Sequence, residues 1–245
     1  MRPLSRLSTA LAAAALAATT MAASPASALV HAPAQGVARH LSHATSSNWA
    51  GWDNTGSTYT SVSASWVQPA VTCSRRETSY SSFWVGLDGD GSNSVEQTGS
   101  EADCSRGTPV YYSWYEFYPA YPVNYSNTVR PGDHFSASVT STGGGNYTLV
   151  LTDSTQGWSQ TKKGSAPSGL NASAEVIAEA PSSNRGVLPL ANFGTVSFSG
   201  ATVNGQALGS VPTPQSITMA SSSTVKASVS GLSGGTAFSV TFHHS

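Results

Sequence analysis

The chain has 245 residues, and only 9 % of them are charged, against roughly 25 % in an ordinary soluble domain. Ser, Thr, Gly and Asn take the place of the missing charges, and the formal net charge is −1. This composition excludes a protein that binds nucleic acid through clustered Lys and Arg, and it favours an exported, β-rich protein. Because few carboxylates are present to lose their charge, we also expect tolerance of acid.

The first 28 residues have the pattern of an export signal. Arg2 and Arg6 precede a small apolar run from Leu11 to about Ala17, and residues 26–28 (ASA) fit the small-x-small rule for cleavage. No later run is long and apolar enough to span a bilayer. We therefore expect a secreted, extracellular protein that has no membrane association once the signal is removed.

Residues 29–45 show no alternation of apolar and polar residues, and we interpret them as a short propeptide or disordered arm. They carry His31, His40 and His43, which gain charge as the pH falls. Two interpretations of the arm remain open. Protonation of these histidines in acid would release the arm from the domain, or the arm is an inert linker. Residues 46–245 then form one large domain, a length that suits a single two-sheet sandwich.

After Ser46 the sequence predicts one short strand after another. Period-2 alternation marks strands at residues 59–67, 82–87, 111–118, 135–140, 147–151, 195–198, 216–219, 225–229 and 238–242. Clusters of Gly, Pro, Asn and Ser separate them, as at 89–91, 130–133, 143–146 and 231–235. No amphipathic helix is predicted after the signal. The pattern predicts an all-β sandwich or jelly roll.

The two cysteines, Cys73 and Cys104, are expected to form a disulfide in an exported protein. The bond would close a loop of about 30 residues and contribute about 3–4 kcal/mol in the chain-entropy model. No histidine lies between or beside the cysteines, so they do not form a zinc site.

Several catalytic systems are excluded because the domain lacks the residues they need. Apart from His243 and His244 at the extreme C-terminus, His134 is the only histidine of the domain, and it has no G-x-S-x-G partner for a serine triad. We expect it at a turn or on the surface. A cysteine peptidase is disfavoured because both cysteines are bonded. The chain also has no H-E-x-x-H motif.

Carboxylates remain, and two of them stand out because apolar strand residues surround them. Asp88 ends the segment FWVGLD and is either a turn residue or part of a site. Glu116 shares a strand face with Tyr112, Trp114 and Tyr118, so poor solvation should raise its pKa. Glu116 is either functional or a structural hydrogen-bond acceptor for the aromatic donors.

The segment 174–179 (AEVIAE) carries the remaining candidate carboxylates. If it is a strand, Glu175, Ile177 and Glu179 point to one side and the three other residues to the opposite side. Two glutamates are costly in a dry core, so this face either lines a groove or is the wet side of a sheet.

A glutamine replaces the expected aspartate in the segment 97–100 (QTGS). This segment is similar to the D-T-G-S loop of aspartic peptidases, and we expect Gln97 in a loop. An aspartic peptidase needs two such loops whose carboxyl groups share a proton. Because the chain has one, and that one lacks the carboxylate, this class is excluded.

Taken together, these segments resemble the glutamic peptidases, the eqolisin family. The matching pieces are 47–51 (SNWAG), 84–89 (WVGLDG), 97–99 (QTG), 114–119 (WYEFYP) and 174–179 (AEVIAE), with a weaker match at 187–193 (VLPLANF). The pieces occur in the order of the family and cover most of residues 47–200.

The resemblance implies a jelly-roll sandwich of two antiparallel sheets, similar to concanavalin, with the substrate groove on the concave sheet. It also implies that Gln97 and Glu179 are the catalytic dyad. Four further residues match groove positions with roles in orientation, pKa tuning or substrate contact: Trp49, Trp84, Asp88 and Glu116. The chain has Ala180-Pro181-Ser182-Ser183 where fungal relatives tend to have acidic residues, which bears on the pH optimum.

The function implied by the resemblance is that of an acid endopeptidase with no metal or cofactor. Its partner would be a protein or peptide substrate, and we expect a monomer. Two other functions remain open. A lectin-like sandwich would bind glycans and leave protein intact. A glycoside hydrolase could use Glu116 and Glu179 as its two carboxylates, but it would have no role for Gln97.

Overall fold

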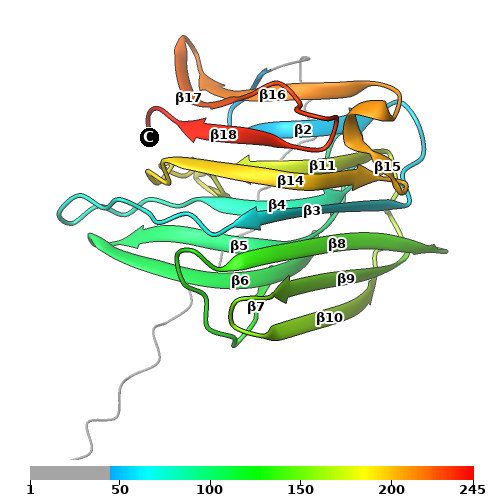
Figure 1. The fold of residues 1–245 in the computed structure, drawn as a ribbon, viewed down its shortest axis with the longest axis horizontal. Coiled ribbons are helices and arrows are strands. Elements are labelled where there is room, and N and C mark those ends of the chain that lie inside the picture. The colour runs from blue at the N-terminus through cyan, green and yellow to red at the C-terminus, as the bar shows by residue number, and fades with distance from the viewer. Residues whose placement is uncertain (1–44) are drawn as a thin grey trace, which may run out of the picture.

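The computed structural model describes residues 45–245, and regular structure there consists of strands and one short 3-10 turn, η1 (Leu208–Ser210). Figure 1 shows the strands in two layers. They are β1 (Thr45–Ser46), β2 (Trp49–Thr55), β3 (Ser61–Val67), β4 (Ser82–Leu87), β5 (Val95–Ser105), β6 (Thr108–Tyr118), β7 (Val123–Asn124), β8 (His134–Gly143), β9 (Asn146–Asp153), β10 (Trp158–Ser165), β11 (Ser173–Glu179), β12 (Ser182–Ser183), β13 (Gly186–Val187), β14 (Thr195–Val203), β15 (Gln206–Ala207), β16 (Pro214–Ser221), β17 (Thr224–Val229) and β18 (Phe238–Phe242).

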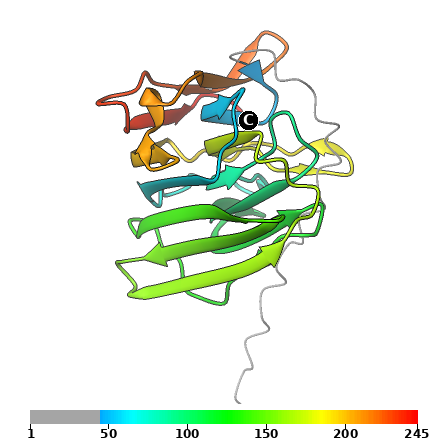
Figure 2. The same ribbon diagram turned by 90° about the vertical axis from the view of Figure 1, so that its right-hand side faces the viewer.

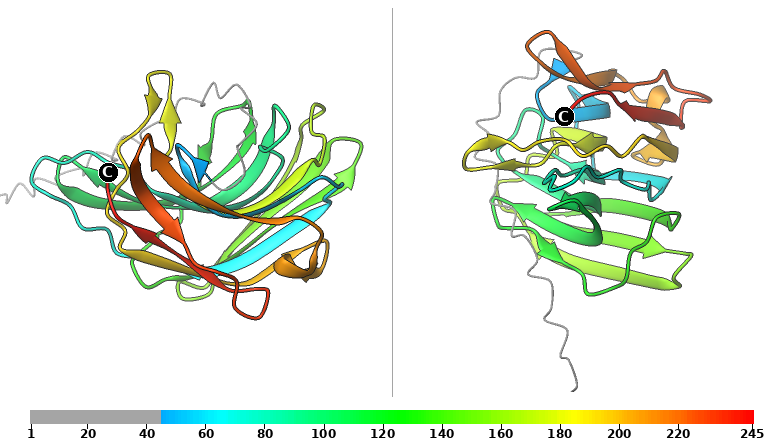
Figure 3. Two further views of the ribbon diagram at one scale, coloured as in Figure 1. Left: turned by 90° about the horizontal axis from the view of Figure 1, so that it is seen from above. Right: turned by 90° about the vertical axis from the view of Figure 1, so that its left-hand side faces the viewer.

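The strands form two stacked sheets that are joined at one side. The first sheet has the order β10-β9-β8-β3-β14-β18-β17, and the second has the order β16-β2-β11-β4-β5-β6-β7. Strand β16 pairs with β17 as well as with β2, so it links the two sheets. Neighbours along this path are antiparallel, whereas β1 pairs in parallel with β16. Both sheets are strongly curved (Figures 2 and 3). The predicted all-β, two-sheet sandwich is therefore confirmed.

The main core lies between the two sheets. It receives alternate residues of the predicted strands, such as Val62, Ala64 and Trp66 of β3. The Trp66 ring stacks on Phe135 of β8 at 5.6 Å. A second, smaller cluster lies on the other face of the second sheet and contains Trp84, Trp114, Ile177 and Ile217. The second sheet therefore has apolar side chains on both faces, and its outer face, away from the first sheet, holds the candidate site.

Three long strands, β2, β5 and β10, were not predicted. The longest, β5, has polar residues on both faces and so lacks an apolar period of two. The prediction that Gln97 lies in a loop is wrong, because Gln97 is the third residue of β5. Strand β10 has alternately exposed residues and ends the first sheet, so it too gives little apolar signal.

The predicted export signal and almost all of the predicted arm lie outside the described residues. Thr45, placed at the end of the arm by the sequence, already pairs with Thr218 as part of β1. Among residues 45–245 no helix is long and apolar enough to cross a membrane.

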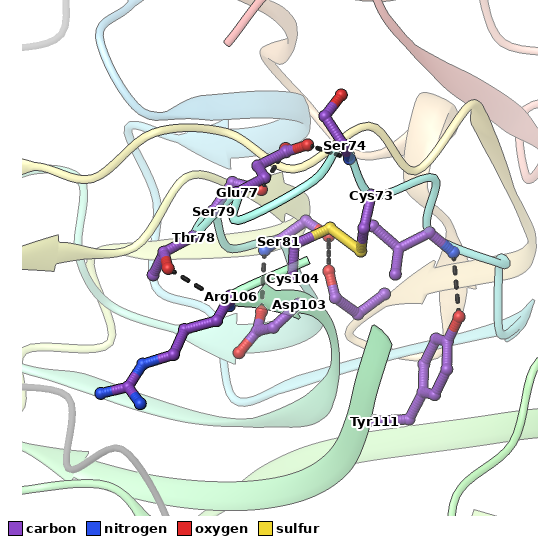
Figure 4. The surroundings of a disulfide bond; sticks show 12 residues. Cys73, Ser74, Glu77, Thr78, Ser79, Ser81, Asp103, Cys104, Arg106 and Tyr111 are labelled. Carbon is purple, nitrogen blue, oxygen red and sulfur yellow. Dashed lines mark hydrogen bonds between the residues drawn. A yellow bond between two sulfur atoms is a disulfide. The ribbon is translucent and has the colours of Figure 1, made fainter. Parts of the chain in front are cut away.

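The predicted disulfide between Cys73 and Cys104 is present, with 5.6 Å between the Cα atoms (Figure 4). It joins the segment before β4 to the far end of β5. Ser79 and Cys104 also exchange backbone hydrogen bonds of 3.1 and 2.9 Å. The bond thus fastens the entry to β4 onto β5, and these two strands carry much of the candidate site.

Candidate active site

The outer face of the second sheet presents its side chains in rows that run across the strands. The strand registers define three neighbouring rows. The first row holds Asp53, Glu175, Gly86, Gln97 and Glu116. The second row holds Gly51, Ile177, Trp84, Gly99 and Trp114. The third row holds Trp49, Glu179, Ser82, Glu101 and Tyr112. Gln97 and Glu179 therefore lie on one face, in the two polar rows on either side of an apolar row.

Glu179 is the last residue of β11, and each of its carboxylate oxygens accepts a hydrogen bond. Asn48 Nδ2 donates to Oε1 at 3.0 Å, and Trp84 Nε1 donates to Oε2 at 2.8 Å. Burial raises the pKa of Glu179 to about 7, while hydrogen bonds from Trp84, Trp49 and Asn48 act in the opposite direction. The carboxyl group is thus oriented at both oxygens and is more basic than an ordinary glutamate.

Gln97 is held from the neighbouring strand by Glu116. Gln97 Nε2 donates to Glu116 Oε2 at 2.5 Å, and Gln97 Oε1 is buried without a hydrogen-bond partner among the described residues. Burial raises the pKa of Glu116 to about 8, and the charge of Glu179 acts in the same direction. The direction of the pKa shift of Glu116 agrees with the expectation, and the donor that Glu116 accepts from is Gln97 rather than one of the aromatic side chains.

Two tryptophans flank Glu179. Trp49 and Trp84 pack edge to face, with ring centroids 5.1 Å apart and an angle of 75° between the rings. Trp84 is fully buried, whereas Trp49 is partly exposed. Trp84 therefore acts on the carboxylate through its indole N–H, and Trp49 is the aromatic ring of this pair that a ligand can contact.

Asp88 lies at the turn after β4 and holds the loop that precedes β11. Its backbone has a positive φ of 66°, and its carboxylate accepts hydrogen bonds from the N–H groups of Leu170, Asn171 and Ala172 at 3.0, 2.9 and 2.7 Å. Both carboxylate oxygens are occupied by these bonds. Asp88 thus supports the strand that carries Glu179.

Glu175 does not line an open groove. It is on the same face as Glu179, as predicted, but it is fully buried, and neither oxygen has a hydrogen-bond partner within residues 45–245. Burial raises its pKa well above the usual range. It faces Asp53 across the β11–β2 pair, and burial raises the pKa of Asp53 to about 8. Burial therefore favours the neutral form of both carboxyl groups.

A protein-family model described as the Peptidase A4 family matches residues 47–242. The chain belongs to the peptidase A4 family. The chain is 32 % identical to aspergillopepsin-2 of Aspergillus niger over 179 residues, which is 64 % of this chain and 64 % of that relative. The aligned segment thus spans slightly less than two thirds of the relative.

Solved structures of the same family have this fold. Scytalido-glutamic peptidase, solved with a transition-state-analogue inhibitor, has a TM-score of 0.70 and 27 % identity, covering 80 % of this chain and 98 % of that one. The eqolisin SCP-B, solved with the tripeptide Ala-Ile-His, has a TM-score of 0.66 at the same identity and coverage. Aspergilloglutamic peptidase from Aspergillus niger has a TM-score of 0.60 and 28 % identity, covering 67 % and 99 %. The resemblance to the glutamic peptidases is confirmed.

Sequence reasoning missed four residues on or beside this face of the peptidase A4 fold: Asn48, Asp53, Glu101 and Asp103. Asn48 lies within the matched segment 47–51, so its position beside Trp49 was a signal. The other three are single acidic residues in strands with little apolar alternation, so no sequence pattern indicated their place in the site.

His134 is exposed at the start of β8, as expected for a surface residue. No cluster in residues 45–245 has the ligands to hold a metal ion.

Proposed function

We propose that this protein is a secreted acid endopeptidase in which Gln97 and Glu179 form the catalytic dyad. The observation that carries the proposal is the pair of hydrogen bonds that orients Glu179 on the face of the sheet that also presents Gln97. Membership of the peptidase A4 family supports the reaction class. The signal-like first 28 residues and the disulfide support secretion.

Glu179 acts as general base and then as general acid. It takes a proton from water as the water oxygen attacks the carbonyl carbon of the peptide. It returns this proton to the amide nitrogen as the C–N bond breaks. A carboxylate whose pKa is raised by burial is a stronger base for the first step, provided that it is ionised when substrate binds.

Gln97 orients the water through its side-chain oxygen and stabilises the oxyanion through its NH₂ group. A neutral amide keeps both properties in acid, where a second carboxylate would be protonated. Glu116 holds the amide from β6. The NH₂ group of Gln97 has two N–H donors, so one can bind Glu116 while the other is available for the oxyanion.

The substrate is a protein or peptide, and the reaction needs no cofactor. Two relatives were solved with a transition-state-analogue inhibitor and with a tripeptide, and this supports the proposal of a peptide substrate here. Trp49 is partly exposed beside Glu179 and would supply an apolar contact for a substrate side chain. We propose that the protein acts as a monomer.

The dyad is tested by Glu179→Gln and Gln97→Ala, assayed for casein cleavage between pH 3 and 8, a range that includes the pKa of about 7 to which burial raises Glu179. We expect Glu179→Gln to lower kcat/KM by roughly 10³-fold or more, and Gln97→Ala by roughly 10²-fold to 10³-fold. Glu77→Gln, a surface carboxylate beside the disulfide, is the matched control and should keep wild-type activity. Near wild-type cleavage by either folded dyad variant would refute the proposal.

The same variants separate the other two functions. A glycoside hydrolase based on Glu116 and Glu179 would clear glucan in a zymogram and would keep much of that activity in Gln97→Ala. A lectin-like sandwich would bind glycans and leave both gelatin and glucan intact. We expect clearing of gelatin in acid, without clearing of glucan.

A further inference from the structure

A second pair of carboxyl groups lies one strand away from Glu179. In the third row of the outer face, Ser82 of β4 pairs with Glu179 of β11 on one side and with Glu101 of β5 on the other. Asp103 lies two residues beyond Glu101, so both side chains are on the same face of β5. Glu101 is 2 % exposed and Asp103 is 1 % exposed. Only the small side chain of Ser82 lies between this pair and Glu179 in the row.

The hydrogen bonds of the two groups differ in a way that assigns their charges. Asp103 accepts from the Ser81 N–H at 3.1 Å and from the Tyr112 hydroxyl at 3.0 Å, one bond to each oxygen. Glu101 accepts a bond from the Ser82 hydroxyl through Oε1, and its Oε2 is buried without a partner in the described part of the chain. A buried anion needs donors at its oxygens, so Asp103 is suited to be the anion and Glu101 the neutral acid.

We infer that Glu101 and Asp103 form a carboxyl pair, one neutral and one anionic, that acts as a positioning element for Glu179 by setting the pH at which the catalytic carboxylate binds its proton. This inference rests on the proposed role of Glu179. The pair makes no contact with the reacting atoms. It acts on Glu179 through the electrostatic effect of its negative charge, with Ser82 lying between them.

The titration behaviour of the groups agrees with this assignment. Burial and the charge of Asp103 raise the pKa of Glu101 well above its usual range, and the charge of Glu179 adds to this. Burial raises the pKa of Asp103 to about 7, while its donors Ser81 and Tyr112 act to lower it. Asp103 therefore ionises before Glu101, and in the same range as Glu179, whose pKa is also raised to about 7.

The charge of Glu179 acts on Glu101, and Glu101 in turn interacts with Asp103, so the pair and Glu179 are linked through Glu101. Other titratable groups face the same region. The charge of Glu179 also acts on Glu116 of β6, whose pKa burial raises to about 8. Tyr112 of β6 and Tyr80 before β4 face Asp103, and burial raises the pKa of both phenols, so they remain neutral. The anion that forms near Glu179 as the pH rises is therefore Asp103.

The test is the acidic limb of the pH profile of kcat/KM in Asp103→Asn. Removal of the anion should lower the pKa of Glu179 and move the limb to lower pH. Asp103 and Glu179 are separated by two strand spacings across the sheet and by one row along the strands, which is roughly 12 Å. At this distance two unit charges shift each other's pKa by less than one unit after screening by solvent and salt. We expect a shift of about half a pH unit, which is roughly a threefold higher kcat/KM on the acidic slope.

The matched control is Asp133→Asn. Asp133 is also buried and also accepts one backbone N–H, from Arg130, but it lies at the turn before β8 in the first sheet. We expect Asp133→Asn to lower the stability of the protein without moving the acidic limb of kcat/KM. An equal shift in both variants, or an unmoved limb in folded Asp103→Asn, would overturn the inference.

Glu101→Gln provides the second measurement. A glutamine can accept from the Ser82 hydroxyl and donate to Asp103, so it reproduces a neutral Glu101 and should leave both the limb and the plateau within about twofold of wild type. If Glu101 were the anion, this variant would show the downward shift instead. Failure of the dyad is recognised separately, because Glu179→Gln would then stay active whatever Asp103→Asn does.

Discussion

The carboxylate of Glu179 is oriented by donors from two different segments. Asn48 lies just before β2, and Trp84 lies in the middle of β4, so the strand neighbours on both sides of β11 contribute one hydrogen bond each. Both donors favour the ionised form of the carboxyl group, whereas burial favours the neutral form. The balance between them decides the pH at which Glu179 is ionised, and hence the pH range of its proposed role as a base.

Trp84→Phe tests this balance. The change removes the indole donor but keeps most of the ring, so the pKa of Glu179 should rise. A base must be ionised, and we therefore expect the acidic limb of kcat/KM to move to higher pH by about one unit. The direction is opposite to that expected for Asp103→Asn.

The control for this prediction is Trp114→Phe. Trp114 belongs to the same apolar cluster, and its indole nitrogen has no hydrogen-bond partner among residues 45–245. The limb should stay in place when this donor is lost. If Trp114→Phe moves the limb as far as Trp84→Phe does, packing rather than the hydrogen bond controls the pKa.

For individual residues, the sequence predicted part of the candidate site. The aromatic neighbours of Glu116 were enough to predict a raised pKa, because they are adjacent along one strand. The choice of Glu179 over Glu175 came from the family resemblance. Asn48, Glu101 and Asp103 could not be placed, because their relation to Glu179 depends on the register of strands far apart in the sequence.

Strand β5 can approach β4 closely because residue 99 is a glycine. A Cβ at Gly99 would lie 2.2 Å from the Phe83 carbonyl oxygen and 2.6 Å from the Trp84 Cβ. Gly99 is two residues from Gln97, and Trp84 donates to Glu179. The contact between these two strands therefore sets the spacing of both members of the proposed dyad.

We expect Gly99→Ala to destabilise the protein by about 1–3 kcal/mol, because the added methyl group must push the strands apart. It should also lower kcat/KM more than the loss of folded protein explains. Urea unfolding and the activity of the folded fraction are the two measurements. Gly231→Ala is the control, since a Cβ there meets no atom within 4 Å. Wild-type stability in Gly99→Ala would show that the strands can adjust without cost.

The predicted elements follow a physical rule. Strands with an apolar inner face and a polar outer face, such as β3, β8 and β18, were found from alternation alone. Strands β2 and β5 were missed because buried polar residues interrupt the alternation, and both strands contribute to the candidate site. In β5, Gln97 of the proposed dyad is one of the buried polar residues that hide the strand.

The whole molecule contains a set of buried acids that are neutral in the folded state. Burial raises the pKa of Asp53, Glu96 and Glu116 to about 8, and that of Glu175 well above its usual range. In the unfolded chain these groups ionise near pH 4. Between these values the folded state binds more protons, so the free energy of unfolding falls as the pH rises.

We therefore expect the thermal midpoint to be highest near pH 4 and to fall steadily up to about pH 8. The stabilising contribution of these groups is complete below about pH 4 and is lost as the pH passes through their folded pKa values. Calorimetry across this range measures the effect. Asp53→Asn should stabilise the protein at pH 8 and change little at pH 4. A midpoint that rises with pH would contradict the account.

At the scale of the molecule, the sequence predicted the fold class and the disulfide correctly. Acid tolerance, expected from the small number of carboxylates, stays a prediction; the burial that raises the pKa of several carboxyl groups would act in the same direction. The sharing of β16 between the two sheets was not predictable, because no local pattern shows that one strand has partners in both.

The strand order also has a consequence for behaviour in crowded solution. Strands β10 and β7 end the two sheets and present unpaired backbone groups, which are templates for cross-β growth. β7 has two residues, too few to template a ribbon, and β10 carries Lys162 and Lys163. The Lys162 ammonium lies over the Tyr115 and Tyr125 rings, at 5.3 and 5.7 Å. Both edge strands are therefore poor templates for the addition of an extended chain, which should protect the protein from recruitment into fibrils.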